Sequence, residues 1–167
     1  MKIISLIATL LLSLSCYALN VGDTVPAFKL SDQNGNIVDG QSFKNKWTIL
    51  FFYPKADTPG CTKQACAFRD NSTKITNLGA QIYGISVNSV KDQKKFFEKY
   101  KLNFPLLADE DAEVAKLFKV KRPLIDIAKR WTFIIGPENK VMDIGEDVDP
   151  VLDSERVINK LKELQKR

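Results

Sequence analysis

Two neighbouring cysteines, Cys61 and Cys66, are the residues of this chain whose type and spacing suggest chemistry. They lie in the segment TPGCTKQAC of a 167-residue chain that contains no histidine. Without histidine, Ser-His and Cys-His nucleophiles of the usual kind are excluded, as is a histidine-ligated zinc or haem site. Two cysteines are too few for a thiolate cluster, so we expect neither a metal nor a cofactor. The thiols themselves are therefore the candidate reactive groups.

Cys61 follows Thr-Pro-Gly at the point where a helical pattern begins. Small and apolar residues recur from there at steps of three and four as far as Ile75, and Gly79 closes the pattern. The first turn of a helix has unpaired N–H groups and a partial positive charge, and both favour a thiolate over a thiol. Cysteines in this position can have a strongly lowered pKa. We therefore predict that Cys61 is reactive, the alternative being a small buried hydrophobic residue.

The spacing of the two cysteines indicates a transient bond. Cys66 lies five residues after Cys61, and an intact α-helix places such Cα atoms roughly 8.7 Å apart on different faces. A disulfide needs Cα atoms within about 7 Å, so the pair can bond only when the first turns unwind. A structural bridge would not melt its own helix, which favours a redox role. The spacing also argues against a thioredoxin-type exchanger, whose C-x-x-C keeps both sulfurs in the first turn.

The elements that position these cysteines alternate between strand and helix along the chain, which predicts a largely parallel central sheet covered on both faces. An Asn34-Gly35 hairpin near the start and a closing hairpin add antiparallel strands. The terminal β-β-α order favours an α/β thioredoxin-like fold, with a central mixed sheet flanked by helices, over a flavodoxin-like one. The predicted strands are 27–30, 36–39, 47–53, 81–87, 104–109, 130–136 and 140–145. The predicted helices are 61–79, 88–101 with Ser89 as cap, 111–120, and one that starts near Pro150.

Residues 1–18, MKIISLIATLLLSLSCYA, differ in kind from the rest of the chain. Their apolar run of roughly 12 residues is too short to cross a hydrocarbon layer of about 30 Å comfortably. One lysine, the apolar run and small residues match a secretory signal peptide ending at Ala18. We expect a single domain at 19–167 that is periplasmic or secreted, with no membrane attachment after removal of the leader. The alternatives are a retained anchor, a buried first strand, or lipidation of Cys16.

Charge and composition exclude some classes of partner. The net charge is +5, with 44% hydrophobic and 27% charged residues. Basic and acidic residues are mixed, and only 121–130 and 160–167 are locally basic. Nucleic-acid binding requires a denser basic stripe, so we expect none.

The segment FFYPKADTPGCTKQACAFRD resembles the active-site segment of peroxiredoxins, and more narrowly the bacterioferritin-comigratory, or Q-type, branch of thiol peroxidases. Pro54, Thr58 and Cys61 match the family pattern Pro-x-x-x-Thr-x-x-Cys. Cys66 matches the second cysteine of the branch, and Arg130 an arginine that opens a later strand. The similarity extends in order over roughly residues 20–165, and its active-site part is highly specific.

The resemblance implies a thioredoxin-like fold and the reduction of hydrogen peroxide or organic hydroperoxides. Cys61 would be the peroxidatic cysteine, and Cys66 would resolve its sulfenic acid as an intramolecular disulfide. A thioredoxin-like dithiol would then reduce the enzyme, which we expect to be a monomer. Many relatives stay in the cytoplasm, so the leader leaves the identity of the reductant open. The rival readings are an envelope thioredoxin-fold disulfide oxidoreductase and a secreted binding domain with one structural bridge.

Lowering the pKa of a thiol is not enough for such a reaction. A thiol of pKa about 8.5 is only about 3% ionised at pH 7. Lowering its pKa to about 6 gives roughly 30-fold more thiolate but costs about tenfold in nucleophilicity, a net gain of about threefold. The site must therefore also stabilise charge on the leaving oxygen. The candidates are the Thr58 hydroxyl, the N–H groups of the helix start and the Arg130 guanidinium, with Pro54 and Pro59 shaping the loop and excluding water.

Overall fold

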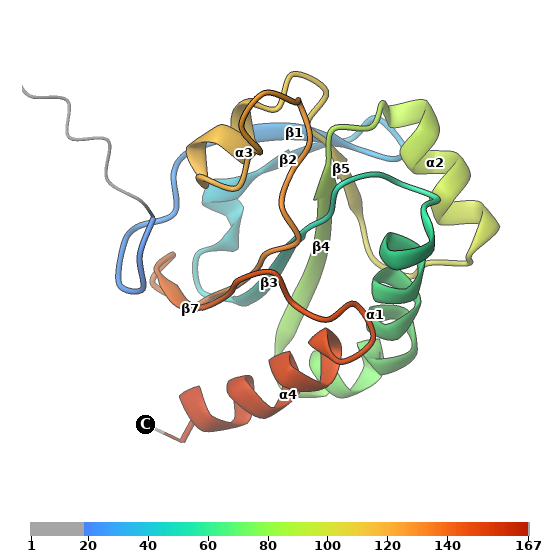
Figure 1. The fold of residues 1–167 in the computed structure, drawn as a ribbon. Coiled ribbons are helices and arrows are strands. Elements are labelled where there is room, and N and C mark those ends of the chain that lie inside the picture. The colour runs from blue at the N-terminus through green and yellow to red at the C-terminus, as the bar shows by residue number, and fades with distance from the viewer. Residues whose placement is uncertain (1–18, 167) are drawn as a thin grey trace, which may run out of the picture.

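A seven-stranded mixed sheet forms the centre of the computed structural model, which describes residues 19–166 (Figure 1). The order of strands across the sheet is β2-β1-β5-β4-β3-β6-β7. Parallel pairing joins β3 to β4 and β4 to β5, while the other four pairings are antiparallel. The strands are β1 (Lys29–Asp32), β2 (Ile37–Asp39), β3 (Trp47–Phe52), β4 (Ala80–Ser86), β5 (Leu106–Ala108), β6 (Thr132–Ile135) and β7 (Val141–Gly145).

The sheet corrects one sequence-based expectation. Alternation of strands and helices predicted a largely parallel sheet, but only the three central strands are parallel. Both hairpins attach at the edges and run antiparallel to their neighbours: β1 beside β5, and β6 beside β3. Local patterning identified the hairpins and could not reveal which edge each one joins. The narrower prediction of a mixed, thioredoxin-like sheet with flanking helices is confirmed.

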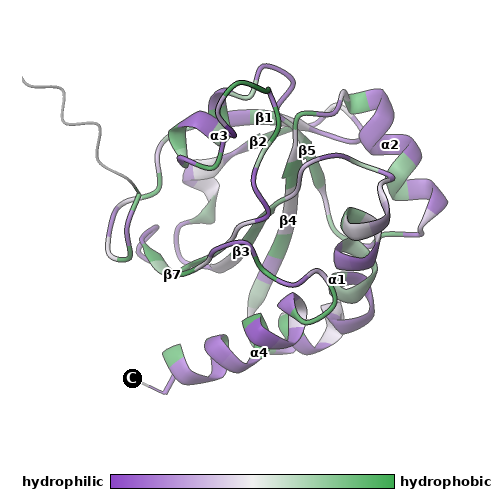
Figure 2. Ribbon diagram, in the orientation of Figure 1, coloured by the Kyte–Doolittle hydropathy of each residue, from purple (hydrophilic) through white to green (hydrophobic). Residues whose placement is uncertain are grey.

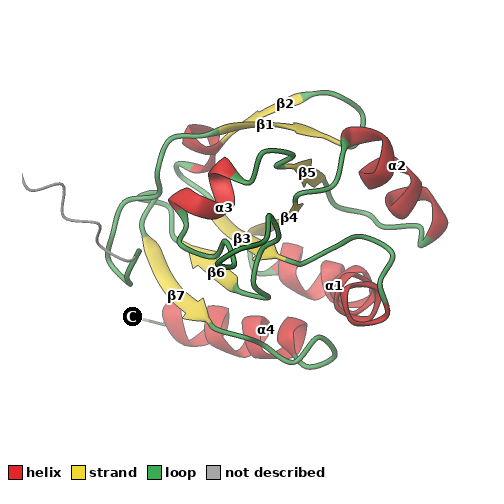
Figure 3. Ribbon diagram, turned by 45° about the horizontal axis from the view of Figure 1, so that its top comes forward, coloured by secondary structure: helices red, strands yellow, loops and turns green. Residues whose placement is uncertain are grey.

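Helices cover both faces of the sheet, as Figure 3 shows from above. One apolar cluster joins α1, α2 and α4 to the sheet, and a second cluster lies on the opposite face with α3 and η1. Along β3 the side chains alternate: Ile49 and Phe51 enter the first cluster, Leu50 and Phe52 the second. The helices are α1 (Pro59–Asn77), α2 (Val90–Lys99), α3 (Glu113–Leu117) and α4 (Asp153–Leu164), and η1 is a 3-10 turn (Gly40–Phe43).

Figure 2 shows the same division by hydropathy, with hydrophobic residues along the central strand β4 and hydrophilic ones on the outer sides of α2 and α4. A continuous apolar strand of this kind is expected where both faces are covered. The segment that contains both cysteines therefore starts from a buried strand, because β3 leads directly into the loop ahead of α1.

Several helix boundaries differ from the predicted ones. The first helix begins at Pro59, two residues before Cys61. The helix predicted at 111–120 is only Glu113–Leu117, because Ala112 and Lys119 have left-handed backbones that end it on both sides. The last helix begins at Asp153 rather than near Pro150: the Asp149 carboxylate accepts the N–H groups of Val151 and Leu152 and forms a separate turn first.

The leader predicted at 1–18 lies outside the described residues. Within residues 19–166 there is no helix with both the length and the apolar character needed to cross a bilayer.

Replacement of Gly84 by alanine is expected to destabilise the fold. A Cβ atom there would lie 2.7 Å from Cζ of Phe51 and 2.9 Å from Cδ2 of Leu106, both buried core side chains. We expect the free energy of unfolding to fall by about 1–3 kcal/mol, the usual cost of overpacking a core. Urea denaturation measures it. Gly136→Ala is the control, because its Cβ would press mainly on the flexible Met142 side chain; equal losses for the two variants would contradict the prediction.

Candidate active site

Cys61 lies in the first turn of α1, as its position in the sequence predicts. Thr58 is the N-cap residue, Pro59 is the first helical residue and Cys61 the third. Proline suits this start because its φ is already helical and it has no N–H to satisfy. The side chain of Cys61 is buried, with 1% of its surface exposed. The sulfur therefore lies at the positive end of the helix dipole in surroundings from which bulk water is largely excluded.

Arg130 contacts the sulfur of Cys61. Its Nη2 atom donates to Cys61 Sγ over 3.5 Å. The register of the sheet brings the two together: β6 runs antiparallel to β3, so Thr132 pairs with Phe51 near the end of β3. The guanidinium also packs against α1, since a Cβ added at Gly60 would lie 3.1 Å from Arg130 Nη2. The structure thus joins two residues that lie far apart in the sequence.

A buried polar chain holds Arg130 in place, and sequence reasoning missed it. Arg130 Nη1 donates to Gln64 Oε1 at 2.8 Å, and Gln64 Nε2 donates to Asp153 Oδ2 at 2.9 Å. The same carboxylate accepts from Thr132 Oγ1 at 2.6 Å and from Arg156 Nε at 3.2 Å. The available signal was the spacing, because Gln64 lies three residues after Cys61 on the same helix face. Asp153 carried no comparable sequence signal.

The acceptor that orients Arg130 is a neutral amide. An amide accepts a hydrogen bond without cancelling the guanidinium charge, so that charge stays available to the sulfur. The carboxylate of Asp153 is balanced instead by Arg156, which also pairs with Asp143 at 2.6 Å. Gln64 therefore orients Arg130, and it is Arg156, not Arg130, that compensates the negative charge of Asp153.

Thr58 and Pro54 lie in the loop between β3 and α1. The Thr58 hydroxyl donates to the carbonyl of Lys55 at 2.9 Å, and its own carbonyl accepts the N–H of Thr62 at 2.8 Å. Thr58 thus closes the loop and starts the helix. Pro54 is half-buried directly after β3. The contact seen at the sulfur comes from Arg130, while these two residues shape the segment that leads to it.

The loop is fastened to the strand beside it. Asn88 Oδ1 accepts a hydrogen bond from the N–H of Ala56 at 2.8 Å. The carbonyl of Ile85 accepts one from the N–H of Tyr53 at 3.0 Å. Beneath the loop, the buried Tyr53 hydroxyl donates to Gln93 Oε1. Burial raises the pKa of Tyr53 well above its usual value, with a smaller contribution from Cys61. The phenol is therefore neutral and adds no negative charge beside the sulfur.

Cys66 is partly buried on the continuous helix α1, and both cysteines are free thiols. The ideal rise and rotation of an α-helix keep their Cα atoms roughly 8.7 Å apart, too far for a disulfide. The structure therefore agrees with the expectation that the sulfurs are unlinked while the helix is intact, and it contains no structural bridge between them.

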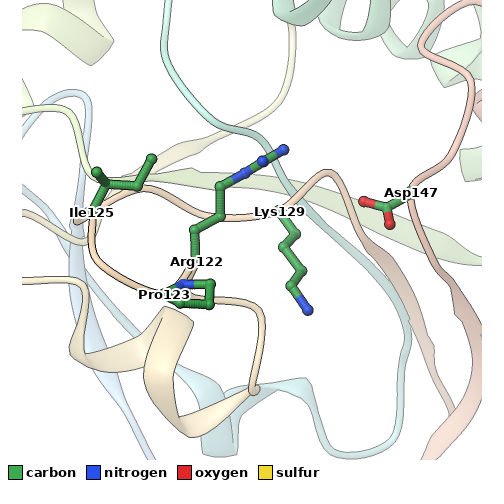
Figure 4. A pocket seen from close by; sticks show the side chains of 5 residues that line it. All are labelled: Arg122, Pro123, Ile125, Lys129 and Asp147. Atoms are coloured by element: carbon green, nitrogen blue, oxygen red, sulfur yellow. The ribbon is translucent and has the colours of Figure 1, made fainter.

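An open depression of about 440 Å³ lies beside the segment that carries Arg130 (Figure 4). Lys129 precedes Arg130 directly, and Val148, which follows Asp147, donates its N–H to the Arg130 carbonyl. The depression borders the site without containing the reactive sulfur. The residues that line the depression are Arg122, Pro123, Ile125, Lys129 and Asp147.

Within residues 19–166 no group of three His, Cys, Asp or Glu side chains is arranged to hold a metal ion.

Comparison with known proteins identifies the family. The model of the AhpC/TSA family matches residues 21–144. The chain belongs to this family. Peroxiredoxin Bcp of Escherichia coli K12 is 37% identical over 151 residues, which cover 87% of this chain and 97% of that protein. The chloroplastic peroxiredoxin Q of Sedum lineare is 45% identical over 121 residues, which cover 72% of this chain and 65% of that protein.

Solved structures place this peroxiredoxin in the Bcp and Q branch. Peroxidoxin BcpB of Mycobacterium tuberculosis superimposes with a TM-score of 0.82 at 36% identity, covering 87% of this chain and 98% of the other. A cysteine-to-serine mutant of PrxQ from Xylella fastidiosa gives a TM-score of 0.84 at 29% identity, covering 89% and 99%. The family and branch inferred from the sequence are confirmed, as are the thioredoxin fold and a thiol peroxidase activity.

Loss of the Gln64 amide is expected to slow the reaction of this peroxiredoxin with peroxide. In Gln64→Leu the charge of Arg130 remains but its orientation is lost, so the second-order rate constant for hydrogen peroxide should fall about tenfold. Arg130→Met should cost about 100-fold or more, because the donor itself disappears. Stopped-flow measurement of peroxide consumption gives both values.

A double-variant cycle tests whether Gln64 acts through Arg130. Adding Gln64→Leu to Arg130→Met should change the rate no further, because the amide then has nothing to orient. Gln81→Leu is the control: this amide likewise makes a side-chain hydrogen bond, to the buried Thr48 Oγ1 at 2.8 Å, but on the sheet away from the sulfur. Full additivity of the Gln64 and Arg130 effects would disprove the positioning role.

Proposed function

We propose that this chain reduces hydrogen peroxide and organic hydroperoxides, with Cys61 as the peroxidatic and Cys66 as the resolving cysteine. The observation that carries the proposal is the buried Cys61 sulfur in the first turn of α1, with Arg130 Nη2 at 3.5 Å. Thiol peroxidase activity itself follows from the family. The assignment of roles to particular residues is the added step.

In the first half of the cycle the Cys61 thiolate attacks one peroxide oxygen. The S–O bond forms as the O–O bond breaks, and water or an alcohol leaves after taking a proton. Negative charge moves from the sulfur to the leaving oxygen. The Arg130 N–H and the free N–H groups at the start of α1 are the donors that stabilise this charge, and one such donor is worth about 10²–10³ in rate. Pro54 and Thr58 hold the loop in the shape that admits a small peroxide.

In the second half the Cys66 thiol condenses with the sulfenic acid. A disulfide forms and water leaves, which requires the first turns of α1 to unwind. An external thioredoxin-like dithiol then supplies two electrons by exchange and restores both thiols. Both cysteines come from one chain, so the cycle needs no second copy and we assign it to a monomer.

The rival oxidoreductase of protein disulfides is not favoured. An exchanger needs two sulfurs that bond without rearrangement of the helix, whereas these two are five residues apart on one intact helix. The relatives named above are peroxiredoxins.

We further propose that the enzyme works outside the cytoplasm. The charged start, apolar run and small residues of 1–18 support export. An exported enzyme would meet a reductant of the cell envelope, so the proposed dithiol partner is one resident there.

Serine variants separate the roles of the two cysteines. Cys61→Ser should abolish peroxide consumption, because a hydroxyl is not a thiolate. Cys66→Ser should reduce one equivalent of peroxide at the normal rate and then stop, because its sulfenic acid has no resolving thiol. Rapid mixing with hydrogen peroxide, followed by steady turnover with a dithiol, measures both steps. Undiminished steady turnover by Cys61→Ser would refute the assignment.

Intact mass of the protein from cell fractions tests export. We expect the periplasmic or secreted form to begin after Ala18, without an added lipid, and to lose two hydrogens after one equivalent of peroxide. A full-length cytoplasmic form would contradict the proposed location, and a lipid-bearing form that begins at Cys16 would contradict the proposed cleavage after Ala18; neither outcome bears on the peroxidase chemistry.

A further inference from the structure

We propose that Lys99 and Tyr100, at the end of α2, act as a clamp on α1 that sets how fast the Cys61 sulfenic acid is converted to the disulfide with Cys66. This inference rests on the proposed function and concerns its second step. The clamp consists of these two residues together with their partners Asp57 and Arg69.

One arm of the clamp holds the loop ahead of Cys61. The carboxylate of Asp57 accepts from Lys99 Nζ at 2.7 and 2.8 Å and from Tyr100 Oη at 2.6 Å. Asp57 directly precedes the N-cap residue Thr58 and has a left-handed backbone with φ of 60°. A carboxylate held by three hydrogen bonds in this conformation fixes the direction from which the chain enters the helix.

The other arm holds α1 just after Cys66. Arg69 Nη1 donates to the Tyr100 carbonyl at 2.6 Å, and its Nε and Nη2 donate to Asp70 at 2.9 Å. Arg69 lies three residues after Cys66, on the same helix face. Asp70, together with the nearby Cys66 sulfur, raises the pKa of Arg69 above its usual value. The same guanidinium therefore contacts the anchor on α2 and lies near the proposed resolving cysteine.

The two arms bracket the segment that has to move. Residues 58–68 lie between them and contain both cysteines. The Cα atoms must come from roughly 8.7 Å to within about 7 Å, so this segment must leave its helical form. Each hydrogen bond at its ends opposes that opening.

The anchor itself is rigid. Phe96 of α2 is buried in the core, and the Tyr100 ring packs edge-on against it with centroids 5.3 Å apart. A crevice of about 220 Å³, lined in part by Lys55, Asp57 and Lys99, separates the loop from α2. The hydrogen bonds of the clamp therefore span a gap that apolar packing does not fill.

Opening competes with further oxidation. In the productive branch the Cys66 thiol attacks the sulfenic sulfur, the S–O bond breaks, and the hydroxyl leaves as water with the thiol proton. In the other branch a second peroxide oxidises the sulfenic acid to a sulfinic acid and is itself reduced to water or an alcohol. A tighter clamp therefore lengthens the life of the sulfenic acid and lowers the peroxide concentration that inactivates the enzyme.

The test is the double variant Lys99→Met, Tyr100→Phe, which removes the side-chain donors of the first arm and keeps the aliphatic stem and the ring. Rapid mixing with hydrogen peroxide, acid quench and intact mass distinguish the sulfenic form, with one added oxygen, from the disulfide. We expect disulfide formation to be about two- to tenfold faster, because the hydrogen bonds removed are exposed and each opposes the opening only weakly. The oxygen-transfer step should be unchanged, and inactivation should require more peroxide.

Lys95→Met is the matched control, because Lys95 is exposed on the same helix and its carboxylate contact, Asp92 Oδ1, is 3.9 Å away.

Added salt should speed disulfide formation in the wild type more than in the double variant, since it screens the Asp57–Lys99 pair. Equal disulfide rates for wild type, control and double variant would refute the clamp. Failure of the proposed function would look different: no protein would gain an oxygen. Thermal unfolding of each variant separates local loosening from loss of the fold.

Discussion

The guanidinium of Arg130 reaches a buried sulfur from the segment just before β6, which runs antiparallel to β3, and the rest of the site is arranged around that contact. The start of a helix places partial positive charge near the thiol. During the reaction, however, negative charge moves from the sulfur to the leaving oxygen, and it must be stabilised on both atoms. A guanidinium can do this because its positive charge is fixed and it carries several N–H donors. Gln64 holds it without neutralising it, and Asp153 holds Gln64.

In the proposed cycle, helix α1 has to meet two opposed requirements. It must be helical to present the Cys61 sulfur at its positive end, and it must open for Cys66 to reach that sulfur. A segment with two such states has to be fastened strongly enough to form and weakly enough to release. The contacts of α2 lie at both ends of this segment, while Gln64 in its interior is held by Arg130 and Asp153.

The sequence revealed most about features that depend on neighbouring residues. The place of Cys61, the edge hairpins and the buried strand 47–53 all follow from local pattern, and the structure places them close to where they were predicted. Arg130 was assigned only through the family resemblance, because its partner lies 69 residues away. The Gln64–Asp153 contact, 89 residues apart, was missed for the same reason. The parallel content of the sheet was overestimated because alternation does not specify edge pairing, and the short α3 ends at left-handed residues that are not glycine.

Asp153 belongs to the last helix, although through Gln64 it holds the arginine that contacts the sulfur. A chain made from its N-terminus therefore carries Cys61 well before it carries the carboxylate that steadies the site. The thiol gains its full surroundings only when nearly the whole polypeptide has been synthesised and has collapsed. Nascent forms of the protein would thus hold a cysteine without these contacts, and the oxidant chemistry would begin with completion of the fold.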